Sequence, residues 1–257
     1  MNEENINRAR ALYYAMFSRC FVFTTDNSRY FELINFIDIL KENPLDKMSQ
    51  NALDDVRKLI KSDSNVAFMS EYDEIFHSPE TKNIRTTASY WDENVESGKK
   101  RVQMQNFLGK TKIRRDEKTY ADYEDSVGFI FTVMSELSEL IANGDAQYKN
   151  TSHCIFEDIL NEFIDDFSRE LYEHESADIF KHIVIILKSF VEFERIYLEV
   201  SAPPIKERVL KQEAAKEEIS QEELERRARN KLLRESGPKV EQEACSKDTA
   251  SDVEVDI

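Results

Sequence analysis

The chain has 257 residues, of which 40% are hydrophobic and 33% charged, with only five glycines and five prolines. This composition supports one large domain with a sizeable core, and the shortage of turn-forming residues argues against a β architecture. The formal net charge of −16 argues against nucleic acid as a partner, because an acidic protein repels phosphate backbones. The charge favours cationic partners such as basic peptide segments, although solubility alone explains it equally well.

The cysteines and the apolar runs of the chain bear on its compartment. Cys20, Cys154 and Cys245 are odd in number and lack CxxC spacing, which favours a reducing environment. The first ten residues contain no apolar stretch of the kind found in secretory signals. No uninterrupted apolar run reaches the length of about 18 residues that a membrane span requires. We therefore expect a cytoplasmic protein without a membrane span.

Apolar residues recur at spacings of three and four over most of the chain, which predicts amphipathic helices and an all-α fold. The inward faces should include Phe31 in the second helix and Met48 in the third. A basic, weakly amphipathic segment at 99–115 has Val102, Phe107 and Leu108 as expected anchors. The last helix is apolar around most of its circumference, so we expect it to lie centrally. The expected helices span about residues 4–23, 28–42, 46–61, 66–76, 123–142, 152–172 and 177–200.

The sequence Ala202-Pro203-Pro204 marks the clearest boundary. All 27 aromatic residues precede it, and residues 206–257 contain 11 Lys and Arg and 14 Asp and Glu. We expect an all-helical domain over residues 1–203 and a charged tail over residues 204–257. Within the tail, residues 206–235 predict a solvated, marginal helix, and the composition beyond it is typical of disorder.

One stretch has a limited likeness to a nucleotide site. Gly109-Lys110-Thr111 resembles the end of a phosphate-binding loop, but Met104 stands where the motif needs a glycine, and no strand is expected before it. An enzyme that uses Lys110 and Thr111 to bind a nucleotide is therefore only a minor alternative. We expect no catalytic residues.

The histidines do not predict a metal site. A metal-binding helical bundle needs two Glu-x-x-His units, and the chain has one, at residues 74–77. We place His174 and His182 near helix ends, exposed to solvent. We expect no metal and no cofactor.

Two stretches predict a binding surface. Residues 66–91 begin as a helix, continue as a polar loop and end on Tyr90 and Trp91, the only tryptophan of the chain. Residues 120–127 are acidic and aromatic. Aromatic rings beside carboxylates in non-periodic stretches suit a groove for an apolar peptide with a cationic end. The alternative is that Tyr90 and Trp91 only pack the loop onto the core, and the residues themselves do not decide between the two.

These stretches resemble the TorD/DmsD/NarJ family of redox-enzyme maturation chaperones. Residues 71–76 (EYDEIF) are similar to the family's Glu-x-x-x-Leu-Phe helix end, with isoleucine for leucine. Residues 86–91 keep the serine and the final aromatic of its Pro-x-x-Ser-x-Tyr loop without the proline. Residues 123–128 keep its acidic pair, with Ser126 at the family's histidine position. The resemblance covers roughly residues 5–200.

The resemblance implies a cofactor-free, cytoplasmic chaperone. Such proteins bind the twin-arginine signal peptide, or another apoprotein segment, of a molybdenum-containing oxidoreductase and hold it back from export until its molybdopterin cofactor is inserted. Formate dehydrogenase, nitrate reductase and the S- or N-oxide reductases are all candidate clients, and the resemblance leaves open whether the chaperone forms a homodimer. An alternative of another class is a helical adaptor that acts through residues 206–235.

The resemblance also implies which residues bind the peptide. Aromatic side chains of the 72–91 stretch would contact its apolar part, and Glu124 and Asp125 would meet its arginines. The expected peptide-binding residues are Tyr72, Phe76, Ser89, Tyr90, Trp91, Tyr123, Glu124, Asp125 and Ser126.

Overall fold

Within the described residues of a computed structural model, which are 2–23, 27–118 and 120–204, the secondary structure is helical and contains no β-strand. This confirms the all-α class. None of the helices in this part of the chain has the length and apolar character needed to traverse a membrane. The helix and the disorder expected within residues 206–257 lie outside the described residues.

The first three helices are α1 (Glu3–Phe21), α2 (Asn27–Glu42) and α3 (Lys47–Leu59). Local capping sets where α3 begins, because the Asp46 carboxylate accepts a hydrogen bond from the Ser49 N–H at 2.7 Å and the Ser49 hydroxyl oxygen accepts one from the Asp46 N–H at 3.0 Å. α1 packs along α7 and against α2, and α3 packs against α10.

The next three helices contain the 66–91 stretch and the basic segment that follows it. They are α4 (Val66–Phe76), α5 (Ala88–Glu93) and α6 (Lys99–Gly109). α4 has the expected bounds. The sequence predicted an irregular loop that continues to Trp91. This was wrong at its end, because Tyr90 and Trp91 lie in the short helix α5.

The long helix expected at 152–172 is an interrupted one. α7 (Val127–Ala142) is followed by the short 3-10 helix η1 (Ala146–Tyr148). Then α8 (Lys149–Ile155), the π-helical turn η2 (Phe156–Leu160) and α9 (Asn161–Glu173) run on without a break in the chain. A π turn leaves carbonyl groups without their usual helical donors.

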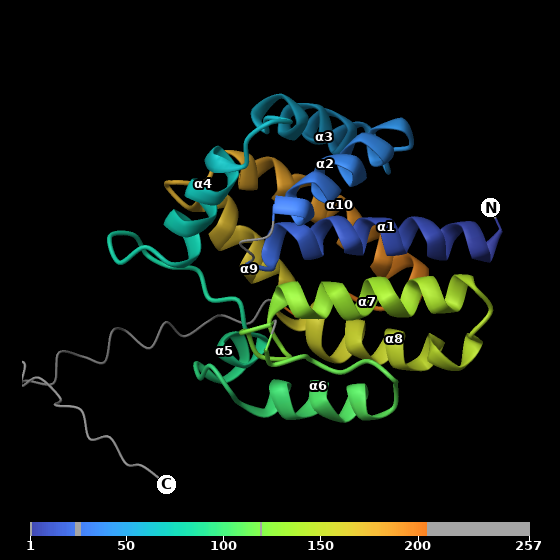
Figure 1. Cartoon of the computed structure of the whole chain (residues 1–257). Coiled ribbons are helices and arrows are strands. Elements are labelled where there is room, and N and C mark those ends of the chain that lie inside the picture. Colours follow the sequence, from blue (N-terminus) through green and yellow to red (C-terminus); the bar gives the residue numbers. More distant parts are fainter. Residues whose placement is uncertain (1, 24–26, 119, 205–257) are drawn as a thin grey trace, which may run out of the picture. The chain divides into compact units, whose positions relative to one another are not determined.

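One carbonyl group of the π turn is bound by α6. The Lys100 ammonium donates a hydrogen bond to the Asp158 carbonyl oxygen at 2.6 Å. In Figure 1, α1, α7, α8 and α6 lie in successive rows, in agreement with the packing of α7 on α1, of α8 on α7 and of α6 on α8. The Lys100 contact therefore attaches α6 to the helix next to it.

The last helix, α10 (Ile179–Leu198), is buried over most of its length and packs on α3 and α9. Its first turn is capped by a side chain from another helix. The Glu71 carboxylate of α4 accepts hydrogen bonds from the backbone N–H groups of Asp178, Ile179 and Phe180 at 2.8, 3.0 and 2.8 Å. A carboxylate at this position satisfies N–H groups that have no partner within the helix and complements the helix dipole. Glu71, the first residue of the family-like 71–76 motif, thus joins α4 to α10.

A buried ion pair joins α1 to α10. The Arg10 guanidinium donates to the Glu194 carboxylate at 2.6 and 2.8 Å, and the Tyr14 hydroxyl donates to the same carboxylate at 2.6 Å. The side chains of Arg10 and Glu194 are 2% and 0% exposed. Asn7 accepts the remaining arginine hydrogen bond at 2.6 Å, so the charged groups are enclosed with their partners.

Four individual expectations were wrong. Phe31, Met48 and Val102 are 49%, 67% and 57% exposed, because the buried residues of α2, α3 and α6 point in other directions around their helices. His174 is buried and not solvated. Its Nδ1 accepts a hydrogen bond from the Ser176 N–H at 3.2 Å, and its Nε2 lies 3.2 Å from the Lys82 carbonyl oxygen.

Candidate functional site

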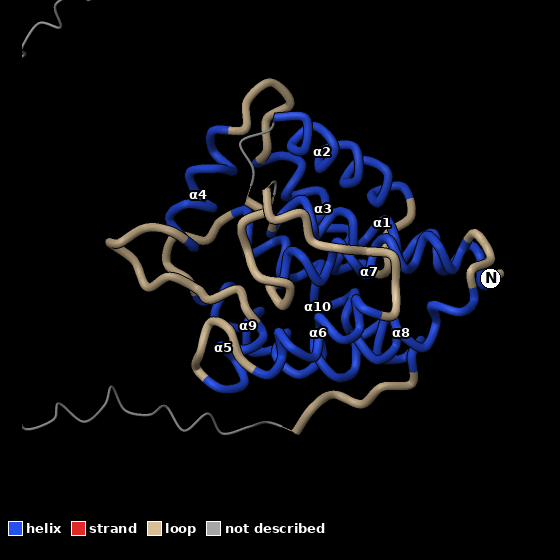
Figure 2. The backbone as a smooth tube through the Cα atoms, turned by 60° about the horizontal axis from the view of Figure 1, so that its bottom comes forward, coloured by secondary structure: helices blue, strands red, loops and turns tan. Residues whose placement is uncertain are grey.

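The two stretches singled out in the sequence meet in space, where the chain enters α5 and α7. A short backbone ladder joins them: the Ala88 N–H donates to the Asp125 carbonyl at 2.9 Å, and the Val127 N–H donates to the Thr86 carbonyl at 2.8 Å. Figure 2 shows that long loops (tan) separate α4 from α5 and α6 from α7. The ladder therefore holds these two loops together at the residues that immediately precede α5 and α7.

Asp125 lies at the centre of this junction and is fully buried. One of its carboxylate oxygens accepts a hydrogen bond from the Ser89 N–H at 2.8 Å, in the first turn of α5. The other, Oδ1, is buried with no hydrogen-bond partner. Burial raises the pKa of Asp125, and the hydrogen bonds from Ser89 offset part of this rise. The Ser89 hydroxyl in turn accepts a hydrogen bond from the Arg101 N–H at 3.2 Å, which joins α5 to α6.

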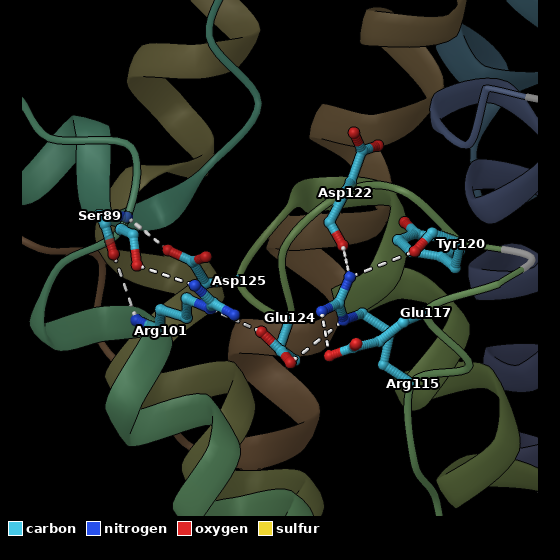
Figure 3. Close-up of polar contacts among 9 residues, drawn as sticks. Ser89, Arg101, Arg115, Glu117, Tyr120, Asp122, Glu124 and Asp125 are labelled. Atoms are coloured by element: carbon cyan, nitrogen blue, oxygen red, sulfur yellow. Dashed lines mark hydrogen bonds and ion pairs between the residues drawn. The ribbon is translucent and has the colours of Figure 1, made fainter.

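Glu124 is held by two arginines of the chain itself (Figure 3). Arg101 and Arg115 donate to its carboxylate at 2.7 and 3.1 Å, and Arg115 also donates to the carbonyl oxygens of Tyr120 and Asp122 at 3.2 and 3.1 Å. Burial raises the pKa of Glu124, but the hydrogen bond and charge of Arg101 outweigh it and bring the pKa to about 2. The carboxylate is therefore ionised and already paired.

Ser126 and Tyr123 complete the sequence-predicted acidic stretch. Ser126 is buried and is the N-cap of α7, where its hydroxyl accepts from the Phe129 N–H at 3.4 Å and lies 3.2 Å from the Tyr120 hydroxyl. Tyr123 is 37% exposed, and the Arg101 guanidinium lies over its ring, 4.1 Å from the centroid. The serine at the family's histidine position thus has a capping role in this chain.

Trp91 is packed onto the core. It is 9% exposed, its indole N–H donates to the Arg85 carbonyl at 2.9 Å, and its ring centroid lies 6.5 and 6.3 Å from those of Phe163 and Phe167. Tyr90 is half-buried, with the Arg85 guanidinium 5.6 Å from its ring centroid. The sequence left two alternatives, peptide recognition and packing of the loop onto the core. The contacts of Trp91 are those expected for packing.

Tyr72 and Phe76 form the floor of a neighbouring surface. They are 3% and 8% exposed, and their ring centroids lie 6.2 and 5.7 Å from that of Phe180 in α10. The Tyr72 hydroxyl donates to the Phe21 carbonyl at 3.4 Å. A peptide could reach only the outer edges of these two rings.

Beside these buried rings lies a surface that we name the aromatic-acidic surface, formed by the exposed Phe23, Asp73 and His77 and the half-buried Asp122. The ring of Phe23 is 45% exposed and lies 5.9 Å from that of Tyr72 and 5.2 Å from that of His77. The His77 Nδ1 lies 3.1 Å from the Asp73 carboxylate. The surface therefore combines an accessible ring with carboxylates at its edge.

Asp122 is one of the two carboxylates of this surface, the other being Asp73. Burial raises the pKa of Asp122, and the nearby charges of His77 and Arg115 offset part of this rise. Burial also raises the pKa of Tyr72, and the charge of Asp122 adds to that effect. Among the described residues the half-buried carboxylate has no hydrogen-bond or ion-pair partner. Figure 3 shows it pointing away from the Arg115 guanidinium, which contacts only the Asp122 carbonyl.

The sequence did not single out several residues of this region. Asp122 lies in the acidic 120–127 stretch but was not distinguished from Glu124 and Asp125, because exposure cannot be read from a non-periodic segment. Phe23 lies just after α1, and its place beside α4 depends on contacts that are distant in the chain. Arg101 was visible only as part of a basic segment.

The residues Gly109-Lys110-Thr111 do not form a phosphate-binding loop. They lie at the C-terminal end of α6, where such a loop would follow a strand. The Lys110 ammonium lies 5.2 Å from the ring centroid of Phe107. Across the described residues, no group of three His, Cys, Asp or Glu side chains is placed to hold a metal ion.

Comparison with known proteins gives a family match over the middle of the chain. The family model described as nitrate reductase delta subunit matches residues 42–169. This match begins at the end of α2 and includes most of α9, and it contains all nine sequence-predicted site residues. No curated protein matches the chain.

Proposed function

Because the chain belongs to the nitrate reductase delta subunit family, a family of maturation chaperones that bind the catalytic subunits of molybdoenzymes, we propose that it holds the precursor of such an enzyme by its signal peptide. In this proposal the chaperone acts in the cytoplasm and retains the client until the molybdopterin cofactor is in place, before twin-arginine export. The identity of the family confirms the resemblance found in the sequence. The signal peptide and the export step are the parts that we propose.

The observation that supports the proposal is the aromatic-acidic surface. A twin-arginine signal is a basic segment followed by an apolar one. The exposed ring of Phe23 offers apolar area for the second part. The Asp122 carboxylate, which is partly desolvated and has no partner in the described residues, offers an acceptor for an arginine of the first part. The acidic chain as a whole would speed the encounter.

The structure changes the roles that we propose for Glu124 and Asp125. Both carboxylates are buried and bound within the chain, so a client arginine would have to displace Arg101 or Arg115 to reach Glu124. We propose instead that they position the surface. Arg115 binds Glu124 and the Asp122 carbonyl at once, and this holds the turn that presents the Asp122 side chain.

A peptide titration tests the direct contacts. A fluorescently labelled twin-arginine signal peptide is titrated with the full chain, with Phe23→Ala and with Asp122→Asn, and anisotropy gives the dissociation constant at several salt concentrations. Each variant should bind about tenfold more weakly, the effect of ~1.4 kcal/mol. Asp122→Asn should also show a smaller salt dependence, because it removes a charge contact.

Matched controls make the result specific. Met48→Ala removes an apolar side chain that is 67% exposed on α3, and Asp145→Asn removes an exposed carboxylate just beyond the far end of α7. Both controls should bind like the unchanged chain. If Phe23→Ala and Asp122→Asn, folded by circular dichroism, bind the peptide as the controls do, the aromatic-acidic surface is not the client site.

A further inference from the structure

His77 joins the separate parts of the aromatic-acidic surface. Its Nδ1 lies 3.1 Å from the Asp73 carboxylate, and its ring centroid lies 5.2 Å from that of Phe23 and 5.5 Å from that of Tyr72. The charge of His77 also acts on the carboxylate of Asp122, which belongs to the loop before α7. The histidine therefore pairs directly with one carboxylate of the surface and influences the other.

Both carboxylates are available to a ligand. Asp73 is 57% exposed, and its ion-pair partner in the described part of the chain is the His77 imidazole, which is 50% exposed. Asp122 has no hydrogen-bond or ion-pair partner among the same residues. An imidazole neutralises a carboxylate only when it is protonated. The charge of His77 therefore decides whether Asp73 is paired.

Three arginines lie near this surface, and two of them are already bound. Arg19 donates a hydrogen bond to the Glu32 carboxylate at 2.6 Å, and Arg115 donates one to the Glu124 carboxylate at 3.1 Å. Within the described ranges Arg29 has no such carboxylate partner, and its charge acts on a neighbouring tyrosine. The surface thus combines two available carboxylates with one unpaired arginine and one histidine, and of these two basic groups only the histidine changes its charge between about pH 5 and 8.

From these contacts we propose that Asp73 and Asp122 each bind one of two neighbouring cationic side chains of the client peptide, and that His77 must be uncharged for this to occur. The inference rests on the proposed function, in which a twin-arginine signal is the client segment, and it adds Asp73 and His77 to the residues that recognise it. A guanidinium beside Asp73 would take the place of the imidazolium, because two cations on one carboxylate repel each other. Bound arginines disfavour the protonated ring, so client affinity should fall as the pH is lowered through the range in which histidine gains its proton.

The pairing of carboxylates with arginines is tested with variants of the peptide. The labelled signal peptide is made with both arginines, with only the first replaced by glutamine and with only the second replaced by glutamine. Anisotropy at pH 8 gives the dissociation constant of each form for the full chain, for Asp73→Asn and for Asp122→Asn. Asp73→Asn should weaken binding of the twin-arginine form by about tenfold, and this loss should be about threefold smaller or less for one of the two glutamine forms. Asp122→Asn should show the same pattern with the other glutamine form.

Glu74→Gln is the matched control on the same helix. Glu74 is exposed and directly follows Asp73 in α4, so its side chain points about 100° away around the helix. This variant should bind all three peptides as the unchanged chain does. A loss in Asp73→Asn that is equal for the three peptides, or that Glu74→Gln reproduces, would be a general effect of charge and would overturn the proposed pairing.

The role of His77 is tested by fixing its charge. Between pH 6 and 8, the unchanged chain should bind the twin-arginine peptide several-fold more weakly at the acidic end. His77→Gln is neutral and should bind tightly throughout this range, whereas His77→Lys keeps a cation and should bind weakly throughout. Circular dichroism establishes that both variants are folded. Equal weakening in the two variants is the result of a merely structural histidine, and it would overturn the proposal.

His153→Gln is the control for the loss of a histidine elsewhere. The Nδ1 of His153, in α8, lies 3.4 Å from the carboxylate of Glu157, four residues further along the chain, which matches the spacing of Asp73 and His77. His153→Gln should keep the pH dependence of the unchanged chain. A pH dependence that persists in His77→Gln would belong to another titratable group and exclude His77 as its origin.

The results separate this inference from the function on which it rests. If the signal peptide binds with an affinity that is independent of pH, and neither carboxylate variant distinguishes the glutamine forms, the inference fails and the proposed function stands. If the unchanged chain binds no form of the peptide at any pH, the proposed function fails and the inference fails with it.

Discussion

The buried ion pair between α1 and α10 leads to a quantitative prediction. In the change Glu194→Ala, the Arg10 guanidinium loses the acceptor for its hydrogen bonds at 2.6 and 2.8 Å and keeps only its bond to Asn7. The Tyr14 hydroxyl loses its acceptor as well. Because the Arg10 side chain is 2% exposed, water cannot replace the carboxylate without opening the helix pair.

The expected cost follows from this enclosure. Removing one partner of a buried ion pair costs about 3–5 kcal/mol, because the other charge stays buried. For a unit of this size, each kcal/mol shifts the melting temperature by about 2–4 °C. Glu194→Ala should therefore lower the melting temperature by roughly 6–20 °C, measured by circular dichroism at 222 nm, with the free energy of unfolding from urea titration.

Two further variants separate the buried charge from other effects. Glu4→Ala breaks an ion pair in which the Glu4 and Arg8 side chains are 48% and 53% exposed. This variant should cost less than about 0.5 kcal/mol. The triple change Arg10→Met, Tyr14→Phe, Glu194→Leu removes the charges and the hydroxyl together and should cost much less than Glu194→Ala alone. A cost below about 1 kcal/mol for Glu194→Ala, or a triple variant less stable than the single one, would refute the reasoning.

Other changes test the remaining contacts. Gly128→Ala should lower the free energy of unfolding by about 1–3 kcal/mol, since its Cβ would lie 2.6 Å from the Phe21 carbonyl oxygen. The control Gly109→Ala, whose Cβ would meet nothing within 4 Å, should raise the free energy of unfolding by about 0.5 kcal/mol. Urea midpoints equal to that of the unchanged chain would contradict both predictions. Glu71→Ala should cost about 1.5–3 kcal/mol because the start of α10 loses its acceptor, and an unchanged melting temperature would exclude this capping role. Asp125→Asn tests the buried carboxylate: burial raises the folded-state pKa above the ordinary 3.8, so the stability that Asp125 contributes is complete below pH 3.8 and is lost as the pH rises through the folded value. The unfolding free energy of the unchanged chain minus that of Asp125→Asn should therefore grow as the pH is lowered from 7 towards 4, and a difference independent of pH would contradict this.

The elements that could be predicted from the sequence are those set by local periodicity. α4 has the predicted bounds, 66–76, because its apolar residues recur over a length that covers three turns. The all-α class follows from the same signal repeated along the chain. α5 was missed because its six residues are fewer than two turns and give no periodic stripe.

The parts of the site that the sequence did not predict depend on contacts between distant residues. Arg101 and Glu124 are 23 positions apart, and His174 and the Lys82 carbonyl are 92 positions apart. Local spacing identified the acidic stretch but not that Glu124 would be buried beside two arginines and Asp125 against the first turn of α5. Of the carboxylates at 122, 124 and 125, exposure leaves only Asp122 available at the aromatic-acidic surface.

The family-like motifs of this chain mainly hold helix ends in place. Glu71 caps α10, Asp125 binds the first turn of α5 and Ser126 caps α7. The side chains available to a client, Phe23 and Asp122, lie next to these motifs and make few polar contacts of their own. Substitution in a motif should therefore reduce stability and client binding together, whereas Phe23→Ala and Asp122→Asn should reduce binding alone. A motif variant that melts normally and yet fails to bind the signal peptide would show that the motif itself touches the client.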